Sequence, residues 1–219
     1  MAIGGAGQLS NGTYGSRIVN NGIFAFDSSA TQTLSGLISG TGALTKGGSG
    51  TLNIYVGNTY TGGTTISAGT VNIAGPEADG SDYALGTGPI TILSGGKLGI
   101  SRSTLTNALI IDGGSIVSGN SFGSAISGPI TINNGIFTTL ASTGTGNIAY
   151  TSDISGTGGI LHQGSRQDSV ITTLSGVSTY EGTTTIAANA ALGFLKRVSL
   201  YNGDTSKWTA DNIIVQAGG

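Results

Sequence analysis

Short runs of alternating apolar and polar residues, separated by glycine-containing turns, recur along the whole chain. In Ile90-Thr91-Ile92 the two isoleucines share one face of an extended strand and the threonine takes the other, because side chains alternate along a strand. Gly95-Gly96 then supplies a turn, since glycine adopts positive φ at no steric cost, and Leu98 resumes the alternation. Such strand–turn–strand units occupy residues 18–24, 66–71, 90–98, 110–116 and 130–137. Strands this short become stable only when a further copy stacks on them, so the pattern predicts stacked strands.

A larger repeat contains these units. Ile38–Gly42 (ISGTG) recurs 116 residues later as Ile154–Gly158, and Tyr60–Ile66 (YTGGTTI) recurs 120 residues later as Tyr180–Ile186 (YEGTTTI). The turn glycines lie about twenty residues apart, which suits a coil of three short strands, and no long window has the 3.6-residue period of a helix. The sequence therefore predicts an all-β parallel β-helix, or solenoid, of about ten coils. An antiparallel β-sandwich is the alternative, and near-identical repeats with few Asn-Gly hairpin turns disfavour it.

Composition excludes several classes of protein. Charged residues make up only 8% of the 219 residues and the net charge is −2, too little to attract nucleic acid or an anionic membrane. The absence of cysteine excludes disulfides, thiolate metal sites and thiol catalysis. No apolar run approaches the ~18 residues of a membrane-spanning helix. The first residues lack the features of a signal peptide, so we expect residues 1–219 to be one β-helix unit excised from a longer chain.

Residues 193–212 depart from the repeat pattern and are expected to form a loop or short helix outside the coil. This segment concentrates charge and contains the single tryptophan; its distinctive residues are Lys196, Arg197, Asp204, Lys207, Trp208 and Asp211. An irregular turn pinned by Trp208 against the rod is the simpler interpretation, and a binding patch is the functional one.

One stretch of the chain resembles a known family. Residues 47–54 (GGSGTLNI), 58–66 (NTYTGGTTI) and 68–71 (AGTV) are similar to the autotransporter-associated β-strand repeat. The second copy, residues 178–186, keeps the linker but has Glu181 and one glycine fewer. The resemblance implies a right-handed parallel β-helix in the passenger region of a bacterial surface or secreted protein, which usually acts as a stalk, adhesin or scaffold.

Two groups of residues are candidate sites of chemistry. Glu77, Asp79 and Asp82 form the single acidic cluster and could hold calcium or cleave a polysaccharide, although a solvated loop between coils is the preferred interpretation. His162 lies near Asp168 and many serines, but no nucleophile-elbow motif supports a catalytic triad. The sequence therefore predicts no catalytic, cofactor-binding or metal-binding residue, no cofactor, and a protein that is not an enzyme.

Threonine runs are a third feature that stacking could organise. Thr64-Thr65, Thr172-Thr173 and Thr183-Thr184-Thr185 could align on one flat face after stacking. Such a face can order water, as ice-binding surfaces do, but threonine also suits strand geometry in its own right.

Three functions follow as hypotheses, in order of preference. The first is a non-catalytic structural or adhesive segment at the bacterial surface, with a host-surface or glycan ligand. The second is a self-assembling fibre subunit, because the open ends of a solenoid invite another copy to stack. The third is a polysaccharide-active enzyme seated at the acidic cluster.

Overall fold

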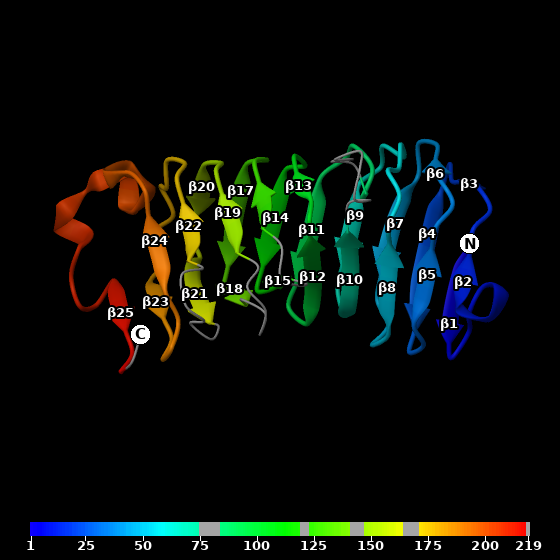
Figure 1. Ribbon diagram of the computed structural model, residues 1–219, viewed down its shortest axis with the longest axis horizontal. Helices are drawn as coiled ribbons and strands as arrows, with labels where there is room; N and C mark the ends of the chain where they lie inside the picture. The colour runs from blue at the N-terminus through cyan, green and yellow to red at the C-terminus, as the bar shows by residue number, and fades with distance from the viewer. Residues whose placement is uncertain (75–83, 119–122, 141–146, 164–170, 218–219) are drawn as a thin grey trace.

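The computed structural model describes residues 1–74, 84–118, 123–140, 147–163 and 171–217. These residues form an elongated rod whose strands lie across its long axis, with the two ends of the chain at opposite ends of the rod (Figure 1). Every pairing between named strands is parallel. Among the described residues, the helical segments are 3-10 turns of three residues, such as η1 (Ser10–Gly12). The prediction of an all-β parallel β-helix is therefore confirmed.

The coil has three faces. The first face is an eight-stranded sheet of β1 (Ala2–Gly5), β4 (Ile23–Ser28), β7 (Ala43–Lys46), β9 (Thr64–Ile66), β11 (Ile90–Leu93), β14 (Leu109–Asp112), β17 (Ile130–Asn134) and β20 (Ile154–Gly156). The second face is a ten-stranded sheet of β2 (Thr13–Tyr14), β5 (Gln32–Leu34), β8 (Thr51–Ile54), β10 (Gly69–Ala74), β12 (Gly96–Ser101), β15 (Ser115–Ser118), β18 (Ile136–Leu140), β21 (Gly159–Gln163), β23 (Thr184–Ile186) and β25 (Ile213–Val215).

The third face is less regular. It begins with the pair β3 (Ile18–Val19) and β6 (Ile38–Ser39) and ends with a five-stranded sheet of β13 (Thr104–Leu105), β16 (Ser124–Ile126), β19 (Ile148–Tyr150), β22 (Thr172–Leu174) and β24 (Leu192–Phe194). Between them the chain continues the stack without named strands. The Thr59 amide donates to the Ile38 carbonyl at 2.9 Å, and the Thr87 amide donates to the Tyr60 carbonyl at 3.0 Å.

The eight strands of the first face correspond to a solenoid of about eight turns, slightly fewer than the ten coils predicted. The second face has ten strands because β23 and β25 extend it beyond β20, the last strand of the first face. Coil length explains the difference: the register gives 18 residues from Ile100 to Ser118 but 29 from Ile186 to Val215. A uniform twenty-residue coil therefore overstates the number of turns.

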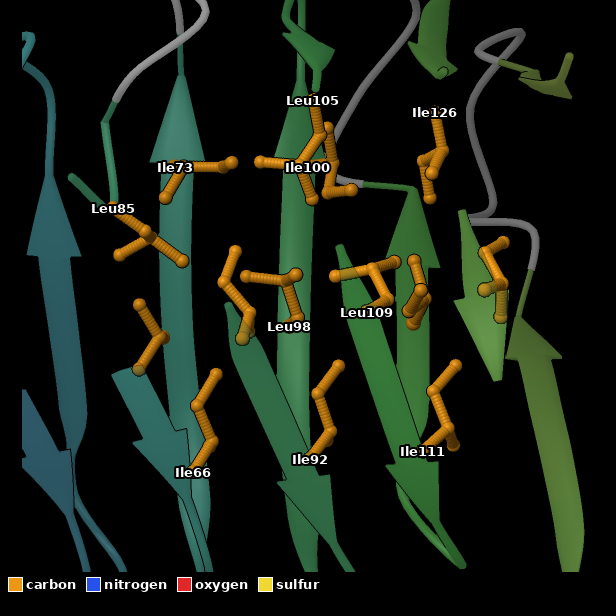
Figure 2. Close-up of a cluster of buried hydrophobic side chains, with 14 of the residues drawn as sticks. Ile66, Ile73, Leu85, Ile92, Leu98, Ile100, Leu105, Leu109, Ile111 and Ile126 are labelled. Atoms are coloured by element: carbon orange, nitrogen blue, oxygen red, sulfur yellow. The ribbon is translucent and has the colours of Figure 1, made fainter. Parts of the chain in front are cut away.

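Apolar side chains fill the interior in rows that run along the rod. Ile66, Ile92 and Ile111 are consecutive members of one row, and Ile73 and Ile100 belong to another (Figure 2). All five are buried, as the alternation within each strand predicts. Burying such side chains supplies roughly 1.5–3 kcal/mol each, so the stacked rows are the main source of stability.

Glycines at the corners let successive coils approach closely. In the duplicated motif, Gly40 and Gly156 both have φ of 108°. A Cβ at Gly40 would lie 2.2 Å from the Asn20 carbonyl oxygen, and one at Gly156 would lie 2.1 Å from that of Ile132. Each atom belongs to the preceding coil, so the motif encodes a corner that admits glycine alone.

The two copies of the duplicated motif lie on different faces. In the first copy the motif begins in β6 on the third face, whereas in the second it begins in β20 on the first face. Likewise Thr64–Ile66 is β9 on the first face, and Thr184–Ile186 is β23 on the second. Counting strands along the first face from β7 to β20 gives five coils. The 116-residue repeat therefore spans five coils plus one face, so the second copy points about a third of a turn away from the first.

Candidate binding site

Residues 195–212, here called the cap segment, follow β24 and lead into β25 with three short 3-10 turns: η2 (Arg197–Ser199), η3 (Tyr201–Gly203) and η4 (Thr205–Lys207). In Figure 1 the cap segment arches over the C-terminal end of the rod. Its beginning continues the first face, because the Ser178 amide donates to the Val198 carbonyl at 2.9 Å. Its last residue joins the second face, because the Thr184 amide donates to the Asn212 carbonyl at 2.8 Å.

Tyr201 anchors the cap segment to the solenoid. Its buried hydroxyl lies 2.9 Å from the Gly182 carbonyl and 2.8 Å from the Asn212 carbonyl, and accepts a hydrogen bond from Thr184 Oγ1 at 3.0 Å. Its ring packs on Tyr180 with 5.1 Å between centroids. Burial raises the pKa of the Tyr201 phenol, so the hydroxyl stays protonated. Tyr201 itself has φ of 47°, a left-handed conformation that these contacts must stabilise.

Two hollows open on the cap segment. The first, here called the Trp208 hollow, has a volume of about 300 Å³ and is lined by Phe194, Leu195, Lys196, Arg197, Leu200 and Trp208. The second has a volume of about 230 Å³ and is lined by Thr179, Tyr180, Tyr201, Asn202, Asp204 and Lys207. The Trp208 hollow thus combines an apolar floor with two cations and no carboxylate.

Backbone hydrogen bonds and a cap fix the position of Trp208. The Asp204 carboxylate caps η4 by accepting from the Ser206 amide at 3.0 Å and the Ser206 hydroxyl at 2.6 Å, which lowers the pKa of Asp204. The Trp208 amide then donates to the Thr205 carbonyl at 3.1 Å. Trp208 is 42% exposed, so the backbone sets its position while part of the residue remains accessible.

Arg197 lines the same hollow, with its stem next to η3. A Cβ at Gly203, which has φ of 73°, would lie 3.2 Å from Arg197 Cγ, so the arginine stem passes close to the backbone of η3. Lys196 and Arg197 are both exposed. Chemically, the hollow can offer a flat aromatic surface together with two positive charges.

Lys46 shows that not every cation of the chain is available to a ligand. It occupies an interior row between Phe26 and Ile66, and its Nζ donates to the carbonyls of Gly48 and Ala68, the latter at 3.1 Å. Burial lowers the pKa of Lys46, and nearby Asp27 opposes this shift. This lysine therefore satisfies corner carbonyls of the coil.

His162 lies in the interior rather than on the surface. It belongs to β21 in register with Ile186 of β23, and 2% of its side chain is exposed. Burial lowers the pKa of His162 to about 4, against the effect of a backbone hydrogen bond with Ala191. The imidazole is thus neutral at physiological pH.

The acidic candidates Glu77, Asp79 and Asp82, and also Asp168, lie outside the described residues. Within the described ranges, no group of three or more His, Cys, Asp or Glu side chains could hold a metal ion. The same part of the chain has no helix long and apolar enough to cross a membrane.

The three threonine runs do not meet on one face. Thr64, Thr172 and Thr184 point inward and are buried, and their neighbours lie on three different sheets. Thr65 instead joins an outward row of the first face that contains Thr45, Thr91 and Thr131. Thr91 and Thr131 occupy the same place in their strand–turn–strand units, and the register of the coils adds Thr45 and Thr65 to the row. Each of these four strands contributes one threonine to the row, and Ile110 of β14 interrupts the row between Thr91 and Thr131.

The fold and the duplicated motif define the class of the molecule: it is a parallel β-solenoid built from sequence repeats. Residues 44–73 and 171–188 match the passenger-associated-transport-repeat family, and each match contains one copy of the Tyr60–Ile66 motif. The chain is also 36% identical over 201 residues to the adhesin BmaC autotransporter of Brucella suis biovar 1 (strain 1330). This alignment covers 88% of the present chain and 5% of that much longer relative. No solved structure matches the chain. Two segments of the chain are therefore passenger-associated transport repeats, and most of the chain is similar to a short part of an autotransporter adhesin.

Proposed function

We propose that this chain is a non-catalytic adhesive segment in the passenger of a bacterial autotransporter, displayed outside the cell. The observation that carries the proposal is the similarity to an adhesin along 88% of the chain, together with two passenger repeats inside the aligned fold. Parallel β-coils provide a rigid support on which an irregular segment can meet a partner surface. The cap segment is the part of the described chain that best fits this role, because it departs from the coil and contains both hollows.

Adhesion can be measured with the chain as it is. Beads coated with residues 1–219 should attach to cultured epithelial cells, and soluble chain should compete with them until attachment is abolished. Beads coated with the same chain after denaturation are the matched control, because they present the same composition without the fold. Attachment equal to that of the denatured control would contradict an adhesive function.

External display requires a separate measurement in the source bacterium. Antibodies raised against residues 1–219 should label intact cells, and protease added outside the cells should remove the label. Labelling seen only after the cells are opened would contradict display at the surface.

End-to-end association is a second candidate function, favoured by apolar side chains at both ends of the rod. Ile214 and Val215 of β25 are exposed, as are Met1 and Ile23 at the other end. β1 and β25 each pair with one strand only, so each has a free edge. Sedimentation over a concentration series should show the mass growing with concentration, and Val215→Lys should suppress this growth. A constant monomer mass at high concentration would exclude the fibre.

A further inference from the structure

We propose that the Trp208 hollow binds a carboxylate-bearing sugar, presented as part of a glycan on the surface to which the passenger adheres. This inference rests on the proposed adhesive function and names the chemistry of its ligand. The sequence pattern singled out Trp208, Lys196 and Arg197, and the structure places all three around one hollow together with Phe194 and Leu200.

The size of the hollow suits a small ring-shaped ligand. Its volume of about 300 Å³ lies at the lower end of small-molecule pockets, which leaves room for one or two sugar rings. The exposed indole of Trp208 offers a flat apolar face, and the apolar C–H face of a pyranose ring packs on such a surface. The indole also retains a polar N–H at its edge, which suits a ligand that is apolar on one side and hydroxylated on the other.

The charge of the hollow selects an acidic ligand. Lys196 and Arg197 line it without any carboxylate, although the whole chain has a net charge of −2. They are two of the eight Lys and Arg residues of the chain, whereas Lys207 lines the second hollow together with Asp204. The arginine fork matches a carboxylate with two parallel hydrogen bonds, and two adjacent cations are superfluous for a neutral sugar.

The backbone around the hollow is set before a ligand arrives. The Asp204 cap fixes the turn that precedes Trp208, and the stem of Arg197 lies close to Gly203. Tyr201 ties the segment between them to the solenoid through its buried hydroxyl. Preorganisation reduces the entropy lost on binding, so a single acidic sugar should bind with a dissociation constant on the order of 0.01–1 mM.

The test uses residues 1–219 and four soluble probes: N-acetylneuraminic acid, glucuronic acid, N-acetylglucosamine and glucose. Isothermal titration calorimetry and ligand-observed NMR should show saturable binding of at least one acidic sugar, at least tenfold tighter than that of either neutral sugar. In the unmodified protein, the fluorescence of Trp208 should change with the same saturation, since it is the single tryptophan of the chain.

Variants locate the site. Trp208→Ala and Arg197→Gln should each weaken acidic-sugar binding at least tenfold. Lys97→Gln removes another exposed cation, on β12 and outside the lining of the hollow, and should leave binding unchanged. Arg197→Gln keeps the apolar floor intact, so it tests the charge even where Trp208→Ala disturbs the cap segment. Equal binding of acidic and neutral sugars, no binding of any probe, or an equal effect of the Arg197→Gln and Lys97→Gln variants would overturn the proposal.

Bead attachment separates failure of this inference from failure of the adhesive function. Beads that attach to cells although no acidic sugar binds would retain the adhesive function and remove the sugar site. Acidic vesicles that bind the chain while soluble sugars do not would also overturn the sugar site. Loss of cell attachment with acidic-sugar binding intact would instead refute the adhesive function.

Discussion

Replacing His162 by leucine should remove a specific acid sensitivity from the solenoid. The native pKa of His162 is lowered to about 4 from the usual 6.5, because the side chain is buried. Above pH 6.5 the histidine is neutral in both folded and unfolded chains, so it contributes no pH dependence. Between pH 6.5 and about 4 the unfolded chain binds a proton that the folded chain does not, and stability falls as the pH falls.

The expected magnitude follows from the width of that window. One pH unit corresponds to about 1.4 kcal/mol, so the unmodified protein should lose roughly 3 kcal/mol across the window. Leucine cannot titrate, and it would pair with Ile186 in the row that also contains Leu98 and Ile116. The variant should therefore be much flatter over the same range.

Urea unfolding at a series of pH values from about 7.5 down to about 4.5 measures this difference. The fluorescence of Trp208 reports the C-terminal coils, whereas circular dichroism reports the whole rod. Other acidic groups titrate in both proteins, so the difference between their slopes isolates His162. Parallel pH profiles for the unmodified protein and the variant would refute the assignment of a buried, neutral histidine.

Two further predictions test the packing of the coils. Gly128→Ala places a Cβ 2.0 Å from the Asn107 carbonyl oxygen and should lower the free energy of unfolding by about 1–3 kcal/mol or more. At Gly22 a Cβ meets nothing within 4 Å, so Gly22→Ala is the matched control and should be close to neutral. Thermal unfolding compares the two variants, and equal melting temperatures would contradict close stacking. Tyr201→Phe removes the hydroxyl that anchors the cap segment and should lower the free energy of unfolding by about 1–3 kcal/mol. Hydrogen exchange should also become faster at the amides of residues 195–212. The control Tyr55→Phe, at an exposed tyrosine, should change neither the stability nor the exchange rates.

The candidate site was partly predictable from the sequence. Trp208, Lys196 and Arg197 stood out because tryptophan and charge are rare in this chain. Phe194 and Leu200 gave no such signal, because apolar residues of this kind are common in every coil and only the turns of the cap segment bring them beside Trp208. The preferred interpretation, an irregular turn pinned by Trp208, did not anticipate that the indole is exposed and that Tyr201 is the residue buried against the solenoid.

The threonine runs show where sequence comparison alone misleads. Thr64 and Thr184 occupy the same place in the duplicated motif, and both are buried beside a tyrosine hydroxyl, as their shared sequence implies. Their outward neighbours, Thr65 and Thr185, nevertheless lie on different faces of the rod. The surroundings of the buried threonine are therefore the same in the two copies of the motif, but the copies face different sides of the rod.

The strands, the glycine corners and the stacked β architecture can be predicted from the sequence, because side-chain alternation and glycine conformation are local properties of a short segment. The direction in which each repeat points is visible only in the folded rod. Coil length varies from 18 to 29 residues, as the registers from Ile100 to Ser118 and from Ile186 to Val215 show, so a 116-residue repeat need not equal a whole number of coils. Backbone pairing with the preceding coil fixes the register, and that pairing turns the second copy of the motif onto the next face.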